Sequence, residues 1–185
     1  MKLKLIKFNC VKSTNDQAIK IIRSKQKRQG IVVSNLQTNG KGTRGKKWIS
    51  RKGNFFASIF FELKETLPDF KEFSLINPII VSKILNQNLT SKVKIKLPND
   101  LLIKSRKVCG ILQELIQFEK KYFLIIGIGI NTRFCPTEKN LKATSLAKHS
   151  NKFVNNSKIL QSLKKNYEAI FYNYKFNKKL LRKIL

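Results

Sequence analysis

Residues 37–61, "QTNGKGTRGKKWISRKGNFFASIFF", limit the class of fold that this chain can adopt. They begin with a loop of three glycines and four cationic side chains, and they end in an aromatic, β-rich segment. From Gly40, the loop matches the first seven positions of the phosphate-binding pattern G-x-x-x-x-G-K-[ST], but Lys47 stands where the pattern needs a hydroxyl. A P-loop also leads from a strand into a helix, whereas residues 53–63 favour a strand. The segment therefore argues against a P-loop nucleotide-binding fold.

The segments on either side of the loop predict one α+β domain. Apolar residues at helical spacing predict three helices, which are 13–28, 72–89 and 157–174. Thr14 and Gln17 form a capping-box pattern in the first helix, and Pro78 is expected only in the first turn of the second helix or at a break. β-branched and aromatic runs predict the strands, which are 30–37, 53–63, 92–97, 101–104, 107–118 and 121–130. This order favours an α+β fold with one mixed, mostly antiparallel β-sheet flanked by helices.

The composition is that of a single folded domain with few cysteines. A length of 185 residues allows one hydrophobic core, and a hydrophobic content of 42% argues against a disordered chain. Apolar runs such as 122–130 are too short to span a bilayer, and the N-terminus lacks the pattern of a signal peptide. Cys10, Cys109 and Cys135 form no C-x-x-C pair, which argues against a disulfide framework or a zinc site. We therefore expect a cytoplasmic protein without a membrane segment.

The chain is strongly basic. Lysine and arginine number 39 against 10 aspartates and glutamates, which gives a formal charge of +29. Such a surface attracts polyanions, whether nucleic acid, an anionic membrane or an acidic protein. The lysines are nevertheless spread along the whole chain, and lysine, asparagine and isoleucine are all abundant, as in proteins from AT-rich genomes. Function and compositional drift both stay open as the cause of the charge.

Four segments concentrate side chains that can carry chemistry. Residues 13–15 ("STN") stand at a helix start, where they either bind a small ligand or only cap the helix. The glycine loop lets backbone N–H groups approach phosphate oxygens, although a mobile basic hairpin is the plain alternative. Residues 98–100 ("PND") form a polar corner, and Lys107 follows where its ammonium can reach an anion held by the loop. Two glycines within 127–131 ("GIGIN") indicate close approach of a ligand or of backbone, or a bulge.

The residues that are missing narrow the chemistry further. His149 is the only histidine, and it lies in a polar tract, so no Ser-His-Asp triad is available. The chain has no G-x-S-x-G motif and no pair of carboxylates placed for acid–base catalysis. Cys109 reads as a small buried hydrophobe rather than as a nucleophile. What remains is cations, backbone donors and one acid in the "PND" corner, which suits electrostatic stabilisation of a phosphoryl or adenylyl group.

In this order, the segments resemble the catalytic domain of the biotin–protein ligases (biotin–acetyl-CoA-carboxylase ligases). The hallmarks of that family are S-T-N, Q-x-x-G-[RK]-G-x-x-G-x-x-W-x-S-x-x-G-N-[LF], K-[WL]-P-N-D-[LI], R-K-[LV]-x-G-I-L-x-E and G-[IA]-G-[IL]-N. The chain supplies "STN" (13–15), the opening stretch (37–61), "KLPNDLLI" (96–103), "RKVCGILQE" (106–114) and "GIGIN" (127–131). "ATSL" (143–146) is also similar, and the resemblance covers residues 8–175.

The resemblance implies a two-step reaction with biotin and ATP as substrates and Mg²⁺ as the metal. The biotin carboxylate attacks the α-phosphate of ATP and gives biotinyl-5′-adenylate and pyrophosphate. The ε-amine of a lysine on an acidic biotin carboxyl carrier domain then attacks this mixed anhydride. Such chemistry needs cations and hydrogen-bond donors more than it needs a nucleophilic side chain.

The resemblance also implies a role for each motif residue. Catalytic roles are expected of Lys41, Arg44, Asp100 and Lys107, with Asp100 also the expected contact of the metal. Biotin contacts are expected from Ser13, Thr14, Asn15, Gln37, Lys41, Gly42, Thr43, Lys107, Gly110, Gly127 and Gly129. ATP and adenylate contacts are expected from Gly40, Lys41, Gly42, Thr43, Arg44, Gly45, Trp48, Asn99, Lys107 and Asn131, with Trp48 over the adenine.

The chain departs from the family pattern in its loop and in its extent. The family loop is commonly G-R-G-R-R-G, and here Lys41 and Thr43 replace the first two arginines, so the planar fork is lost at both positions. Leu97 stands where tryptophan is common before P-N-D. We expect one catalytic domain over 1–185, with no N-terminal winged-helix DNA-binding domain and no small C-terminal barrel.

Two alternative functions stay open. A lipoate–protein or octanoyl–protein ligase shares the superfamily fold, although its signatures differ from the glycine loop and P-N-D pair found here. A basic nucleic-acid-binding protein is the alternative from another class, but most phenylalanines lie in apolar runs that read as core rather than as stacking platforms. Whether the chain is a monomer or a homodimer is not decided by its sequence.

Overall fold

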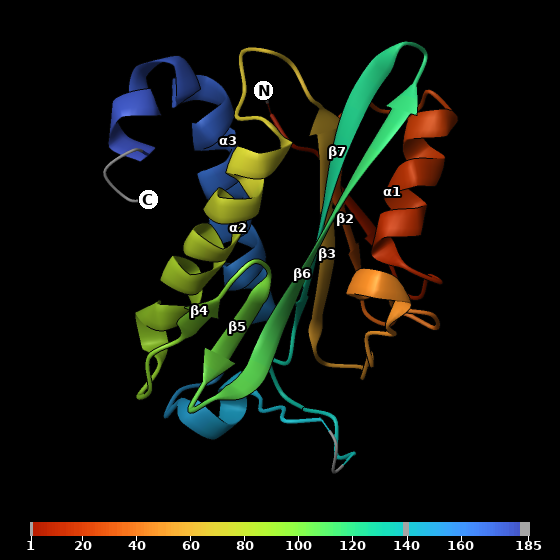
Figure 1. Cartoon of the computed structure of the whole chain (residues 1–185). Helices are drawn as coiled ribbons and strands as arrows, with labels where there is room; N and C mark the ends of the chain where they lie inside the picture. Colours follow the sequence, from red (N-terminus) through yellow and green to blue (C-terminus); the bar gives the residue numbers. More distant parts are fainter. Residues whose placement is uncertain (1, 139–140, 182–185) are drawn as a thin grey trace.

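The computed structural model describes residues 2–138 and 141–181, with all side chains in those ranges except those of residues 88 and 173–181. Seven strands form one sheet in the order β1-β2-β3-β7-β6-β5-β4 (Figure 1). The strands are β1 (Leu5–Phe8), β2 (Gln29–Ser34), β3 (Phe55–Glu62), β4 (Lys94–Lys96), β5 (Asp100–Ile103), β6 (Arg106–Phe118) and β7 (Lys121–Ile130). β1 and β2 pair in parallel, and the other neighbours pair antiparallel. The predicted α+β fold with a mixed, mostly antiparallel sheet is confirmed.

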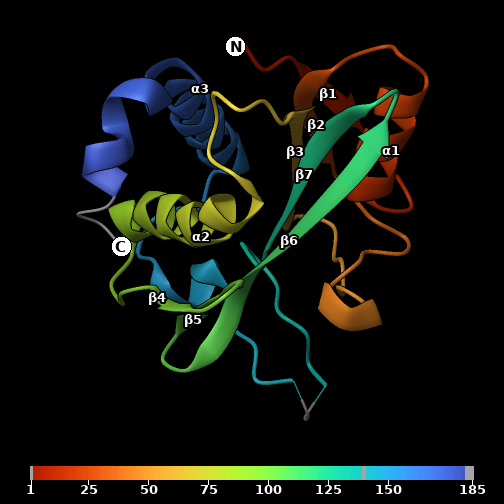
Figure 2. The same ribbon diagram turned by 45° about the horizontal axis from the view of Figure 1, so that its top comes forward.

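Helices cover both faces of the sheet. α1 (Thr14–Arg23) connects the parallel strands β1 and β2, as a parallel pair requires a crossover. α2 (Phe70–Leu85) and α3 (Asn156–Leu181) pack against each other. Figures 1 and 2 show these two helices on the opposite face of the sheet from α1. Three short 3₁₀ turns complete the described elements, and they are η1 (Thr43–Gly45), η2 (Asn86–Asn88) and η3 (Leu146–His149).

The two faces of the sheet differ in what they bury. Successive strand residues point to opposite faces, so on β3 Ile59 and Phe61 join the large core beneath α2 and α3, while Phe60 joins a smaller cluster with α1. On the same α1 face, the next position of β3 is Ser58, which is fully buried. The strand period thus places a polar side chain under α1, where the opposite face has isoleucine and phenylalanine.

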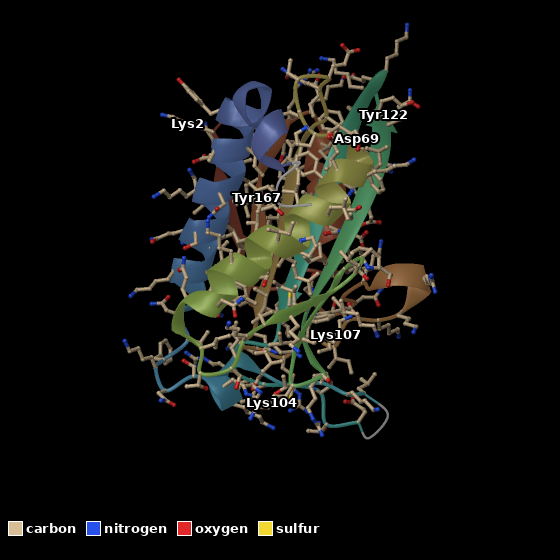
Figure 3. All side chains as sticks on the ribbon, turned by 60° about the vertical axis from the view of Figure 1, so that its left-hand side comes forward. Lys2, Asp69, Lys104, Lys107, Tyr122 and Tyr167 are labelled. Atoms are coloured by element: carbon tan, nitrogen blue, oxygen red, sulfur yellow. The ribbon has the colours of Figure 1, made fainter. Side chains whose placement is uncertain are left out.

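α3 is tied to α2 and to the sheet by a buried polar chain. Tyr167 donates a hydrogen bond from its hydroxyl to Asn77 Oδ1 at 2.7 Å, and Asn77 Nδ2 donates to Gln113 Oε1 at 2.8 Å. Figure 3 shows Tyr167 in the space between the two helices. Burial raises the pKa of the Tyr167 hydroxyl, so this group stays protonated and remains a donor. These bonds fix the register of α3 on α2.

The first helix and the strand after it are shorter than predicted. Ser13 rather than Thr14 caps α1, because its hydroxyl accepts the N–H of Asp16, and the predicted Thr14–Gln17 capping box is wrong by one residue. The predicted strand 30–37 ends at Ser34, whose side chain donates to the carbonyl of Leu36 at 2.7 Å and turns the chain out of the sheet. Because the chain turns here, Gln37, which follows β2, lies within hydrogen-bonding distance of Thr14.

The second and third helices differ from the prediction mainly at their ends. α2 begins at Phe70 because Asp69 and Glu72 form a capping box, a signal that the prediction passed over. Pro78 lies in the interior of α2, so its expected place in the first turn is wrong. Pro78 is itself buried, and burial of the helix against the core offsets the backbone hydrogen bond that proline cannot make. α3 begins at Asn156 and runs past the predicted end at 174.

Candidate functional site

A small cavity of about 40 Å³ lies where α1 begins and the glycine loop approaches β6 and β7. Most residues predicted for the site line it, and they are Ser13, Thr14, Asn15, Gln37, Lys41, Gly42, Thr43, Trp48, Asn99, Lys107, Gly110, Gly127 and Gly129. Ile111, Leu112 and Ile128 complete the wall and were not predicted. Alternation along β6 would have indicated Leu112, since it lies two residues from Gly110.

The start of α1 and residue 37 form one polar wall of the cavity. The N–H and the hydroxyl of Thr14 donate to Gln37 Oε1, at 2.8 and 3.1 Å. Gln37 Nε2 donates to Ser50 Oγ at 3.1 Å. These bonds hold the Gln37 amide in one orientation, and Ser13 and Thr14 are both buried. The STN motif therefore does more than cap α1, although Ser13 also caps it.

Gly127 is required because it leaves space for the side chain of Asn15, and not because of an unusual backbone angle. Asn15 is 2% exposed, and its Oδ1 lies so close to Gly127 that any side chain there would collide with it. Ser58 Oγ lies 2.5 Å from the same Oδ1 and 2.7 Å from Thr14 Oγ1. The sequence prediction missed Ser58, although its place on the α1 face of β3 follows from the period of the strand.

The glycine loop closes as a short hairpin against α1. The N–H of Gly42 donates to the carbonyl of Lys46 at 2.7 Å, and the N–H of Trp48 donates to that of Gly40 at 2.8 Å. Gly45 turns the loop with φ +71°. Lys41 forms an ion pair with Asp16 of α1. The hydrogen bond to Asp16 raises the pKa of Lys41 despite an opposing effect of burial, so this ammonium is charged at neutral pH.

Trp48 separates the first cavity from a second one. Its ring covers Gly110 and Gly129, since a Cβ at either glycine would lie 2.8 or 2.6 Å from ring atoms. The ring lines both cavities, and Lys107 Nζ is 5.5 Å from its centroid. The expected position over adenine stays a prediction, because the structure shows the ring on the glycine floor.

Lys107 lies at the junction of the two cavities, both of which it lines together with Gly42, Thr43 and Trp48. Its ammonium forms an ion pair of 2.5 Å with Asp100 Oδ1. Its backbone is held on the other side, because its N–H donates to the carbonyl of Lys142 and its carbonyl accepts the N–H of Thr144. The segment "ATSL" (143–146) thus positions Lys107, a role that its sequence alone did not indicate.

The second cavity has a volume of about 230 Å³ and a basic wall. Lys46, Lys47 and Lys142 line it beside Lys107. Asn131, predicted to contact the nucleotide, lines it as well and donates from Nδ2 to the carbonyl of Thr144 at 3.1 Å. Within the described part of the chain, Asn131 Oδ1 is buried without a hydrogen-bond partner. An unpaired acceptor of this kind suits a ligand that brings its own N–H donor.

Four predicted residues line neither of these two cavities: Gly40, Arg44, Gly45 and Asp100. Gly40 and Gly45 shape the loop, since a Cβ at Gly40 would lie 2.6 Å from the carbonyl oxygen of Trp48. Arg44 is exposed in the 3₁₀ turn. Asp100 contacts Lys107, and residues 2–138 and 141–181 contain no group of three His, Cys, Asp or Glu side chains that could hold a metal. The metal role of Asp100 stays a prediction.

The cationic side chains and backbone N–H groups of this site can bind anions and stabilise developing negative charge. The Cys109 side chain belongs to the core beneath α2 and α3, and burial raises the pKa of its thiol, so it is no nucleophile. His149 contacts Thr144 Oγ1 through Nε2 at 2.9 Å, and burial with two nearby lysines lowers its pKa. None of the described residues therefore forms a nucleophile–base pair at this site.

Residues 7–131 match the biotin/lipoate A/B protein ligase family. The chain belongs to this family. Among curated relatives, the bifunctional ligase/repressor BirA of Escherichia coli is 33% identical over 111 residues, which are 59% of this chain and 35% of BirA. BirA of Bacillus subtilis is 28% identical over 176 residues, or 92% of this chain and 54% of that protein. The biotin–[acetyl-CoA-carboxylase] ligase of Paracoccus denitrificans is 27% identical, over 67% of this chain and 52% of the relative. The chain thus spans about half of these ligases or less.

Solved structures of ligases share the fold. The biotin protein ligase of Aquifex aeolicus in complex with biotin and ATP superimposes with a TM-score of 0.76 and 28% identity, covering 92% of this chain and 71% of that one. A biotin protein ligase from Leishmania major in complex with biotinyl-5-AMP shows the same fold, with a TM-score of 0.73 at 21% identity over 97% of this chain and 78% of that chain. Across the described residues, no helix has the length and apolar character needed to cross a membrane.

Proposed function

We propose that this chain is an ATP-dependent biotin–protein ligase that makes biotinyl-5′-adenylate and transfers biotin to a lysine of a carrier protein. The observation that carries the proposal is the junction of two cavities at Lys107, Trp48, Gly42 and Thr43. One cavity has a polar wall of hydroxyl and amide groups, as a ureido ring requires, and the other has a basic wall, as a nucleotide requires. Their common border is where a carboxylate and an α-phosphate would meet.

In the first step, a biotin carboxylate oxygen attacks the α-phosphorus of ATP, and the bond to the leaving pyrophosphate breaks. Lys107 and Lys41 would stabilise the charge on the transferring phosphoryl group, and the N–H groups of the glycine loop would contact its oxygens. In the second step, the uncharged amine of the carrier lysine attacks the carbonyl carbon of the anhydride, AMP leaves, and the amine loses a proton. Positioning and electrostatics thus supply the catalysis.

Each cavity would hold one part of the adenylate. The polar groups of Ser13, Thr14 and Gln37 would bind the ring of biotin. The free Oδ1 of Asn131 would accept a hydrogen bond from a donor on the adenine. Trp48 now covers the floor at Gly110 and Gly129, so we infer that its ring shifts toward the second cavity as biotin enters.

Mg²⁺ would enter with ATP rather than occupy a site built by the protein alone. At nucleotide sites this ion is commonly held by one or two carboxylates, with phosphate oxygens and water as the remaining ligands. Asp100 is the carboxylate that fits this role, since it lies beside Lys107 at the junction. When bound, the ion would neutralise charge on the phosphates.

The acceptor that we propose is the biotin carboxyl carrier domain of acetyl-CoA carboxylase, which we expect to be acidic. A chain with a formal charge of +29 attracts such a partner and speeds its encounter at low ionic strength. We also propose that residues 1–185 act as one catalytic domain in the cytoplasm. A lipoate–protein ligase, which the family also includes, is less favoured, because the relatives and solved structures reported above are biotin ligases.

Transfer to a purified carrier domain tests this function. The chain, ATP and labelled biotin are incubated with the carrier domain, and a variant of the carrier with arginine for its acceptor lysine serves as the control. We expect the label on the native carrier alone, and only with ATP. Transfer of lipoate in place of biotin would contradict the proposal.

A further inference from the structure

Glu114 closes the motif "RKVCGILQE" (106–114) and has no part in the function proposed above. It lies on β6, two and four residues from Leu112 and Gly110 of the cavity wall, so it shares their face of the sheet. Glu114 does not line the cavity itself. Its Oε2 accepts a hydrogen bond of 2.5 Å from Nδ2 of Asn15, which does line it. The carboxylate therefore stands directly behind a wall residue.

This hydrogen bond fixes the orientation of the Asn15 amide. Asn15 is almost completely buried, and the other contact of its Nδ2 is the carbonyl of Leu112 at 3.5 Å, the long limit for a hydrogen bond. An ionised carboxylate can only accept, so the NH₂ end of the amide must face Glu114. The oxygen end then faces Ser58 and Gly127.

The orientation passes from Asn15 to the rest of the polar wall. Ser58 has one hydrogen to donate and touches both Asn15 Oδ1 and Thr14 Oγ1. An amide oxygen accepts only, so the Ser58 hydrogen belongs to Asn15, and the single hydroxyl hydrogen of Thr14 is shared between Ser58 Oγ and Gln37 Oε1. A buried network is strong when every member is satisfied and weak when one is not. The acceptor at Glu114 thus sets the direction of the hydrogen bonds under the cavity.

We propose that Glu114 is a positioning residue for biotin, acting through Asn15 and Ser58 on Thr14 of the cavity wall. This proposal rests on the proposed function. A different role is that of charge alone, because Glu114 also helps to raise the pKa of Lys41, after the larger effect of Asp16. The two roles separate in a variant that keeps an acceptor oxygen but loses the charge.

Three variants make the test. Glu114→Leu removes both the acceptor and the charge, whereas Glu114→Gln removes the charge and keeps an amide oxygen for Asn15. Glu119→Gln, at the exposed tip of the same hairpin, makes the same change in net charge far from the cavity. Glu114 is only half-buried, so these variants should fold, and thermal melting checks this. If Glu114→Leu does not fold, Glu114→Ala takes its place.

The readouts are the Kd for biotin without ATP, by calorimetry, and the KM for ATP. We expect Glu114→Leu to raise the Kd for biotin about 10- to 100-fold, since a buried donor loses its partner. Glu114→Gln should stay within about threefold of the wild type, the range of a retained neutral hydrogen bond. The Kd for biotin of Glu119→Gln should equal that of the wild type, and the KM for ATP should be unchanged in all three variants.

Two results would overturn the role of Glu114 while leaving the proposed function intact. One is a wild-type Kd for biotin in Glu114→Leu. The other is an equal loss in Glu114→Gln and Glu114→Leu, which would assign the effect to charge near Lys41. A wild-type chain that binds no biotin would instead show that the proposed function is wrong, and the role of Glu114 would fall with it.

Discussion

The two faces of the sheet bury different chemistry. Beneath α2 and α3, β3 and β7 contribute isoleucines and phenylalanines to one large core. Beneath α1 the apolar cluster is smaller, and of the same two strands β7 contributes Gly127 and Gly129 to the wall of a polar cavity, while β3 places Ser58 behind Thr14 and Asn15 of that wall. The face beneath α2 and α3 therefore supplies most of the hydrophobic stabilisation, whereas the face beneath α1 buries less apolar surface and places polar groups around a cavity. Substitutions on the two faces should separate stability from activity.

The largest effect is expected on the apolar face. Phe61 is fully buried, with its ring 5.3 Å from Phe73 and 4.7 Å from Phe171. Phe61→Ala should lower the free energy of unfolding by about 3–5 kcal/mol, because it leaves a cavity among these rings. Urea unfolding measures the loss. At a temperature where the variant is folded, its KM for biotin should equal that of the wild type, and a large rise would contradict the division between faces.

Lys107→Ala should show the opposite pattern. The ammonium lies at the junction of the two cavities and contacts Asp100. Its loss should reduce the rate of adenylate formation about 10²–10³-fold, the usual result of removing one charge-stabilising donor. The melting temperature should change little, since this ion pair is partly exposed. Unimpaired adenylate formation would show that Lys107 has another role.

A smaller loss of stability is expected at the contact between α2 and α3. Tyr167→Phe keeps the ring but leaves Asn77 Oδ1 without its 2.7 Å hydrogen bond. The free energy of unfolding should fall by about 1–3 kcal/mol, with biotin binding unchanged. Chemical denaturation checks the first value and calorimetry the second. An unchanged stability would mean that another donor satisfies Asn77.

The smallest effect concerns pH. Burial, Lys104 and Lys148 lower the pKa of His149 below its value of 6.5 in the unfolded chain. The neutral form is therefore favoured by folding, and the resulting stability is present above pH 6.5 and is lost as pH falls through the lowered pKa. When the pH is lowered from about 7.5 to about 5.5, the melting temperature of His149→Gln should therefore fall less than that of the wild type. An equal loss in both proteins would contradict the prediction.

The sequence predicted the elements that have a strong period or a strong motif. Strand 121–130 was predicted at its observed bounds, and strand 107–118 to within one residue. Most of the site residues line one cavity because the motifs lie at the start of α1, in the glycine loop and on the neighbouring strands β6 and β7, which the fold brings together. Local pattern was enough for these features.

Other features depend on tertiary contacts that no local pattern encodes. Pro78 is tolerated inside α2 because packing outweighs one lost backbone hydrogen bond. Ser58 looks like one more residue of an apolar strand until α1 places Asn15 beside it. The basic residues around the second cavity come from the glycine loop, from the start of β6 and from segment 141–143, which meet only in the folded chain.

Pyrophosphate exchange into ATP tests the central claim most directly, because it isolates the step assigned to the junction of the two cavities. Biotin, lipoate and octanoate are offered separately to the wild-type chain and to Lys107→Ala. We predict exchange that depends on biotin in the wild type and is reduced about 10²–10³-fold in the variant. Exchange with lipoate or octanoate but not with biotin would contradict the account.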